Sequence, residues 1–206
     1  MQSLISRILE GENQHLDFKK TIQDSRKIAR SLVAFANSKG GSLLIGVKDN
    51  GSIAGIRSEE EIHMIEVATL LYCHPKLPYT CLTHSISGKT VLEVQVAPMP
   101  QTLWKAQDEQ GKWQVWLRQQ DACILAPGDY ITLHKALSKP APPLLELDTH
   151  MTRMLSLIAQ QTQGISTRDL SRLLHLSRNK TLHMCIQACR MKLLKFEPGE
   201  GRFYSV

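Results

Sequence analysis

The chemical feature that stands out in this 206-residue sequence is the uneven position of its positive charge. Residues 138–206 hold 10 Lys and Arg against 5 Asp and Glu, whereas residues 1–137 hold 15 against 14. The last third of the chain therefore carries +5 of the total net charge of +6. Phosphate backbones are the commonest partner of such a basic segment, although a basic segment can also simply be solvated. The charge favours a nucleic-acid partner.

A second group of chemically active residue types lies in the middle of the chain. The residues are Cys73, His74, Cys81 and His84. Structural zinc sites do use two cysteines and two histidines. However, an adjacent Cys-His pair matches the spacing of no common zinc finger, so we expect no zinc site here.

Two frequent signatures of enzymes are missing from the sequence. It contains no Gly-x-x-x-x-Gly-Lys-Ser/Thr phosphate loop and no Gly-x-Ser-x-Gly nucleophile elbow. The first cradles the phosphates of a nucleotide, and the second exposes a catalytic serine on a sharp turn. The sequence therefore supports neither ATP hydrolysis nor serine hydrolysis.

A proline-rich segment separates the basic end from the rest of the chain. Residues 138–143 read SKPAPP, and three prolines in four positions extend neither a helix nor a central strand. We interpret residues 138–148 as a stiff linker, with one domain at 1–137 and a smaller one at 149–206.

The elements predicted after the linker place the basic residues. Apolar residues at helical spacing predict three helices, the third from Arg178 to about Leu193, and a hairpin follows with its tip at residues 198–201. This order resembles the winged helix-turn-helix. In that fold, one group faces the nucleic acid from the third helix: Arg178, Asn179, Lys180 and His183. Lys195 and Arg202 would lie on the hairpin near phosphates, and the alternative is a winged helix used only for protein contact.

Before the linker the pattern mixes helices and strands. A cap at Asp24 or Ser25 begins a helix that runs to about Asn37, and residues 42–47 read as a buried strand. Further strands are predicted at 91–96 and 112–118. The fold class is therefore α+β, a mixed domain of about 135 residues followed by the small helical domain.

Three segments of this first domain resemble the Schlafen-type AlbA-like domain. They are GENQHLDFK at 11–19, AFANSKGG at 34–41 and IGVKDNGSIAG at 45–55. The three blocks occur in the family's order, and the resemblance covers about residues 5–135. Many bacterial members are described as transcriptional regulators, and they often precede a winged helix.

The resemblance also implies a second chemistry. Vertebrate Schlafen proteins are endoribonucleases of tRNA-like substrates that use three carboxylates and a divalent metal. The matching positions are Glu12, Asp17 and Asp49, and Lys19 would steady a phosphate oxygen. Such carboxylates hold Mg²⁺ or Mn²⁺, which activates water. In the family the second acid is Glu, so Asp17 is shorter by one methylene.

The remaining features concern location. No apolar run approaches the roughly 18 residues of a membrane span, and no signal peptide is recognisable. Five cysteines without a secretory signal fit a reducing cytoplasm. These features predict a cytoplasmic protein without a membrane contact. The resemblance, together with the basic second domain, implies a homodimeric DNA-binding transcriptional regulator. RNA binding, a metal-dependent endoribonuclease and a dimerisation module are the alternatives.

Overall fold

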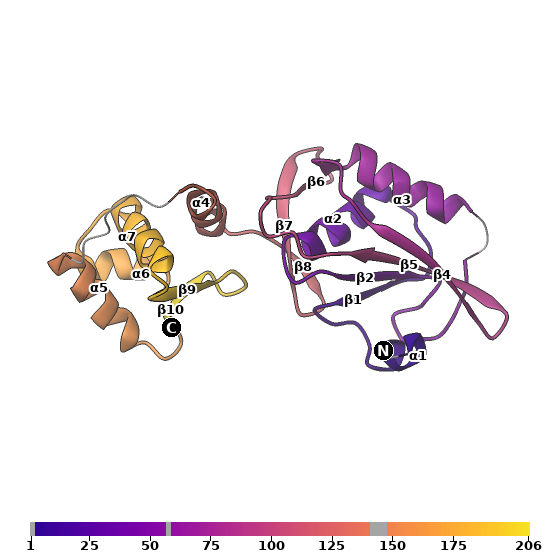
Figure 1. Cartoon of the computed structure of the whole chain (residues 1–206), viewed down its shortest axis with the longest axis horizontal. Coiled ribbons are helices and arrows are strands. Elements are labelled where there is room, and N and C mark those ends of the chain that lie inside the picture. Colours follow the sequence, from indigo (N-terminus) through magenta and orange to yellow (C-terminus); the bar gives the residue numbers. More distant parts are fainter. Residues whose placement is uncertain (1–2, 57–58, 141–147) are drawn as a thin grey trace. The chain divides into compact units, whose positions relative to one another are not determined.

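The computed structural model describes residues 3–56, 59–140 and 148–206. The chain forms two compact units, Met1–Leu125 and Ala126–Val206, which we describe separately (Figure 1). Both helices and sheets are present, which confirms the predicted α+β class. None of the helices in the described ranges combines the length and apolarity that crossing a lipid bilayer requires.

A four-stranded sheet forms the base of the first unit. Its strand order is β1 (Leu16–Lys19), β2 (Gly41–Ile45), β5 (Lys89–Val96) and β4 (Thr80–Ile86). β1 and β2 are parallel, and the other neighbours are antiparallel. The parallel pair requires a crossover, which the helix α2 (Ser25–Ala36) provides. The carboxyl ends of β1 and β2 therefore lie at the same edge of the sheet.

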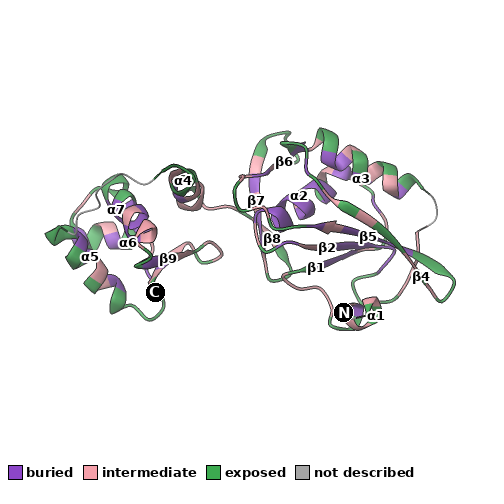
Figure 2. Ribbon diagram, viewed as in Figure 1, coloured by how far each residue is buried: buried purple, intermediate pink, exposed green. Residues whose placement is uncertain are grey.

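The helix α2 is the centre of the first hydrophobic core. It begins at Asp24, whose side chain accepts the backbone N–H of Arg26 at 2.9 Å. Most of α2 is buried (Figure 2). Ile28, Leu32 and Phe35 recur at helical spacing and are at most 2% exposed. They pack against apolar residues of the first sheet and of the second sheet. Full burial of one such side chain stabilises the fold by roughly 1.5–3 kcal/mol.

The second sheet of this unit is antiparallel, in the order β3 (Cys73–His74), β6 (Lys105–Gln107), β7 (Trp113–Gln119) and β8 (Ala122–Leu125). The helix α3 (Glu60–Leu71) contributes Ile65 and Ala68 to the core around α2. The short helix α1 (Leu4–Leu9) covers the opposite face of the first sheet, where Ile8 packs with Phe18.

The second unit contains four helices and a hairpin. The helices are α4 (Gly128–Leu137), α5 (Thr149–Ala159), α6 (Thr167–Leu174) and α7 (Arg178–Arg190), and the antiparallel hairpin is β9 (Leu194–Glu197) with β10 (Arg202–Ser205). Three helices followed by a hairpin is the order that the sequence predicted for residues 149–206. α7 ends at Arg190, three residues before the predicted end at Leu193.

The helix α4 was not predicted, and it packs with the second unit. Its Leu133 is 6% exposed within the core of that unit. Arg178 of α7 donates to Asp129 of α4 at 2.9 Å, and Arg190 donates to the carbonyl of Ala136. The second unit therefore begins before the linker predicted at 138–148, of which residues 141–147 lie outside the described ranges.

Candidate nucleic-acid interface

The first turns of α7 present polar and basic side chains to solvent. Ser177 caps the helix by accepting the backbone N–H of Lys180 at 3.3 Å. Thr181, Leu182 and Cys185 are buried and hold the helix against the core. Asn179, Lys180 and His183 lie on the opposite, solvent-facing side of the helix. Arg178 is exposed as well, because it is the first residue of α7, although it lies on the side that faces the core and α4.

Two of these side chains already have partners within the unit. Arg178 is 61% exposed in its side chain, and its Nη2 atom forms the ion pair with Asp129. The Nε2 atom of His183 lies 3.2 Å from Nε2 of Gln187, one turn further along α7. An exposed ion pair contributes little stability, about 0–1 kcal/mol, so Arg178 can exchange Asp129 for a phosphate or a base edge at small cost.

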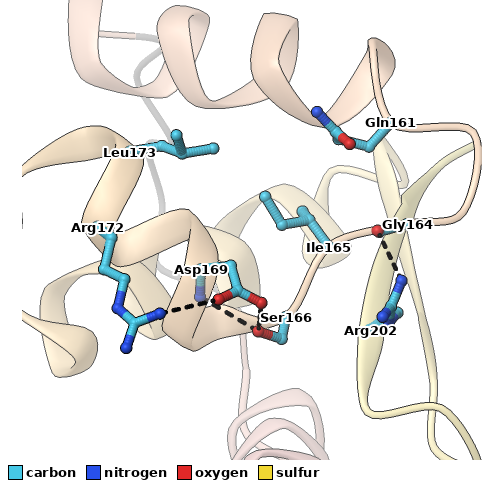
Figure 3. Close-up of a pocket in the computed structure, with 8 residues that line it drawn as sticks. All are labelled: Gln161, Gly164, Ile165, Ser166, Asp169, Arg172, Leu173 and Arg202. Atoms are coloured by element: carbon cyan, nitrogen blue, oxygen red, sulfur yellow. Dashed lines mark hydrogen bonds and ion pairs between the residues drawn. The ribbon is translucent and has the colours of Figure 1, made fainter.

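The hairpin residues selected from the sequence have different positions. Lys195 is exposed, and its Nζ atom lies 5.9 Å from the ring centroid of Tyr204. Arg202 points toward the turn before α6, where its Nη1 atom donates to the carbonyls of Gln163 at 3.1 Å and Gly164 at 3.4 Å (Figure 3). The sequence predicted that Arg202 contacts phosphates, whereas in the structure this guanidinium also anchors the hairpin to the turn.

A shallow pocket of about 360 Å³ lies beside Arg202 (Figure 3). Ser166 caps α6 there, and its hydroxyl donates to Asp169 at 2.7 Å. Arg172 donates to the other oxygen of the same carboxylate at 3.4 Å. The carboxylate of Asp169 therefore interacts with the capping serine and forms an i,i+3 ion pair with Arg172. These local helix interactions explain the three polar residues without a ligand.

The acidic residues selected in the first unit do not all meet. Asp17 on β1 is 4% exposed, and its Oδ2 atom accepts the hydroxyl of Ser31 at 3.0 Å. Its Oδ1 atom lies 3.2 Å from Nζ of Lys19 and 3.6 Å from Nη2 of Arg118. Glu12 accepts the backbone N–H of Phe18 at 2.7 Å. Burial and the neighbouring Asp17 carboxylate raise the pKa of Glu12, so the structure does bring Glu12, Asp17 and Lys19 together.

Asp49 lies apart from this pair, in an exposed turn between Val47 and Ile53. Across the described part of the chain, no three Asp, Glu, His or Cys residues form a group that could hold a metal ion. Both oxygens of Asp17 already have partners, two of them the cationic Lys19 and Arg118. The described residues therefore do not fit the divalent metal that the triad would require.

Arg118 on β7 is a structural residue whose role the sequence did not reveal. Its side chain is 1% exposed. The Nη2 atom donates to the carbonyls of Leu16 at 3.0 Å and Asn13 at 3.1 Å, and Nε donates to Asn13 at 3.2 Å. Arg118 thus ties the second sheet to the segment that carries Glu12 and Asp17. The only signal in the sequence is a charged residue directly after the apolar run at 115–117 of this strand.

The residues considered for zinc have other contacts. Cys73 is 4% exposed, and burial raises the pKa of its thiol to about 12. His84 lies on β4 and contacts Glu93 through Nε2 at 2.8 Å. These contacts account for the two side chains as a core residue and as an ion-pair partner.

Comparison with known proteins identifies the first unit. No curated protein matches the chain significantly. Among solved structures, the DIP2311 protein from Corynebacterium diphtheriae matches with 18% identity and a TM-score of 0.45, over 70% of this chain and 32% of the other. This chain thus spans about a third of the length of that structure.

A second solved structure is the N-terminal domain of a protein from Nitrosomonas europaea described as related to the ATP-dependent DNA helicase RecG. It matches with 17% identity and a TM-score of 0.38, over 73% of this chain and 97% of the other. The family comparison is decisive: residues 12–127, more than half of the chain, match the model of the Schlafen AlbA_2 family. The protein belongs to the Schlafen AlbA_2 family.

Proposed function

We propose that the protein binds duplex DNA as a transcriptional regulator, through a winged helix formed by its second unit. The observation that carries this proposal is the exposure of Arg178, Asn179, Lys180 and His183 in the first two turns of α7. The Schlafen AlbA_2 family, to which the chain belongs, is associated with nucleic acids. A nucleic acid as the partner is therefore consistent with both units.

The chemistry of the α7 face suits the major groove, which is wide enough to admit a helix. Arginine pairs with the O6 and N7 atoms of guanine, and asparagine pairs with the N6 and N7 atoms of adenine. Both types occur side by side at Arg178 and Asn179, at the end of the helix that a helix-turn-helix points at the bases. Residues 126–206 also hold 11 Lys and Arg against 6 Asp and Glu, which supports attraction to phosphates.

The hairpin complements the helix in this proposal. Lys195 is exposed on β9 and contacts a phosphate as a flexible point charge. Arg202 maintains the angle of the hairpin through its bonds to the turn before α6, and its Nε and Nη2 donors are available for a phosphate. We also expect the protein to act as a homodimer on two symmetric half-sites, which the ratio of protein to DNA at saturation would test.

The test is a titration of labelled duplex DNA with the full chain and with the double variant Arg178→Gln/Lys180→Gln. Each lost phosphate contact reduces the slope of log affinity against log salt by about 0.9, so loss of Lys180 should reduce the slope by about 0.9, whereas loss of the base contact of Arg178 should cost about 1–3 kcal/mol of binding free energy. The affinity at low salt should fall by roughly tenfold or more. The matched control is Lys135→Gln/Lys139→Gln, which removes the same charge from exposed positions on and just after α4.

A third variant tests whether the ion pair of Arg178 competes with DNA. Asp129→Asn frees Arg178 from its ion pair, so it should raise the affinity for duplex DNA. Equal affinities and salt slopes for the α7 variant and its control would contradict the proposal. In that case a protein-contact role of the second unit becomes the better explanation.

A further inference from the structure

A basic hollow lies in the first unit at the edge where the parallel strands β1 and β2 end. The chain leaves β1 through Lys20 and Thr21, and it leaves β2 through Gly46 and Lys48. β5 is antiparallel to β2, so its first residue, Lys89, lies at the same edge. Three lysines from three separate segments therefore converge on one place.

The wall of the hollow is backbone held in a defined position. The carbonyl of Gly46 accepts the backbone N–H groups of Ala54 at 2.8 Å and Gly55 at 2.9 Å. Gly46 has a φ of +94°, and a Cβ atom there would lie 2.9 Å from the carbonyl carbon of Gly55. Only glycine allows this close approach, which folds residues 53–55 back against the edge of the sheet.

The hollow has a volume of about 420 Å³. It is lined by Lys20, Lys48 and Lys89 together with Thr21 and residues 53–55, and none of these lining residues is acidic. The Nζ atom of Lys89 donates to the carbonyl of Ile53 at 2.8 Å, which fixes this ammonium at the rim. Asp49 follows Lys48 in the chain but does not line the hollow. The walls therefore present positive charge and a hydroxyl without a neutralising carboxylate.

We propose that this hollow binds the phosphate of a nucleotide, within a single-stranded nucleic acid or as the free nucleotide. Lysine is a frequent point-charge ligand of phosphate, and bringing three ammonium groups together is favourable when an anion neutralises them. The volume of the hollow falls in the range of about 300–1,000 Å³ that is typical of small-molecule sites. The hollow is therefore large enough for a nucleotide and not only for a phosphate ion. An unpaired nucleotide or a strand end can be splayed out into such a hollow, whereas a regular duplex keeps its nucleotides paired and stacked.

This inference goes beyond the proposed function, because it concerns another unit and another form of nucleic acid. The test uses the full chain and a fluorescein-labelled oligouridylate, titrated by fluorescence anisotropy at several salt concentrations. The hollow variant is Lys20→Gln/Lys48→Gln/Lys89→Gln. Its matched control is Lys27→Gln/Lys39→Gln/Lys76→Gln, which removes three exposed lysines of the same unit that do not line the hollow.

We expect the hollow variant to lose about 100-fold in affinity at about 0.1 M salt, and its salt slope to fall by about 2, because single strands give a slope of about 0.7 per phosphate contact. The control should stay close to the unmodified chain. Replacing the three lysines by arginine keeps the charge and should restore binding. The lysines are exposed, so tryptophan fluorescence should report an unchanged fold for all variants.

Competition with AMP then distinguishes the two sources of the phosphate. If AMP displaces the oligouridylate from the unmodified chain but not from the hollow variant, the site binds a single nucleotide. Binding of the oligouridylate that depends on the three lysines but resists AMP assigns it to a strand. Equal affinity of the hollow variant and its control for both probes overturns the inference. The duplex titration of the α7 variant is independent of these results, so failure of one proposal is distinguishable from failure of the other.

Discussion

The buried carboxylate of Glu93 allows a quantitative test of the first unit. Glu93 lies on β5, and the whole residue is 1% exposed. Its Oε1 atom accepts Nη1 of Arg7 from α1 at 2.7 Å, and its Oε2 atom lies 2.8 Å from Nε2 of His84 on β4. One carboxylate therefore joins α1, β4 and β5. The perturbation that removes its charge with little change of shape is Glu93→Gln.

The magnitude follows from the pKa of Glu93. Burial raises this pKa, but hydrogen bonds from Arg7, Ser42 and Gln95 outweigh it and lower the pKa from 4.5 to about 2. One pKa unit corresponds to about 1.36 kcal/mol, so the ionised carboxylate stabilises the folded unit by about 3 kcal/mol at neutral pH. Because the folded pKa is depressed, this stability is present above about pH 4.5 and is lost as the pH falls toward 2.

The assay is chemical denaturation of the full chain between pH 7 and pH 3. All three tryptophans of the sequence, Trp104, Trp113 and Trp116, lie in the first unit, so their fluorescence reports the unfolding of that unit. The unmodified chain should exceed Glu93→Gln in free energy of unfolding by about 3 kcal/mol at pH 7 and by about 1 kcal/mol at pH 3. The control is Glu59→Gln, which changes an exposed glutamate.

A free-energy difference that stays constant from pH 7 to pH 3 would refute this reasoning. It would mean that Glu93→Gln acts through packing and not through the ionised carboxylate. A pH profile of Glu59→Gln that resembles that of Glu93→Gln would refute it as well, because the effect would then not depend on the contacts of Glu93.

Three further predictions concern other residues of the first unit. Gly46→Ala should destabilise the first unit by about 2 kcal/mol or more, because the new Cβ atom would contact Gly55. The control is Gly88→Ala, which has a similar φ of +75° but open space around the position and should cost about 1 kcal/mol. Similar losses for the two variants in tryptophan-monitored denaturation would contradict the steric argument. Asn37→Ala should cost about 3 kcal/mol in the same assay, since the side chain bonds to the carbonyls of Trp104 and Trp116 and to the N–H of Trp104, each at 2.9 Å; a loss below about 1 kcal/mol would show that water replaces these bonds. End-labelled tRNA incubated with Mn²⁺ should stay intact on a denaturing gel, because Asp49 lies apart from the other two acids; metal-dependent cuts that vanish in Asp49→Asn would show that the acids assemble on the substrate.

The local elements were predictable from the sequence because their signals are local. The cap at Asp24 and the apolar residues at helical spacing predicted α2, and the structure places it at Ser25–Ala36. The strands around residues 42–47 and 91–96 were predicted from apolar runs and alternation, and they form β2 and β5. Gly40 has the positive φ, +72°, that the stop of a helix requires.

The features that the sequence did not predict depend on contacts between residues that are far apart in the chain. The sequence indicated Asn37 only as the end of a helix, whereas in the structure its side-chain amide binds the backbone carbonyls of Trp104 and Trp116. The helix α4 lacks a side-chain cap, so no start signal revealed it, and it is placed by the burial of Leu133 in the core of the second unit. Such contacts leave no periodic trace in the sequence.

The candidate binding residues also fall into two groups, those predicted from local spacing and those brought together only by the tertiary structure. Residue types and their spacing alone selected Arg178, Asn179, Lys180 and His183, because the start of a helix and its 3.6-residue period can be predicted from neighbouring residues. The sequence also supplied Lys20, Lys48 and Lys89, but only the parallel pairing of β1 with β2 and the antiparallel return of β5 bring them to one hollow. Asp17 and Asp49 show the opposite case, since the resemblance assigned both acids to one site but the described residues contain no group of three acids that could hold a metal ion. Helix and strand periodicity depends on neighbouring residues and can be predicted from them. Contacts between distant segments depend on the strand order and the packing of the folded chain.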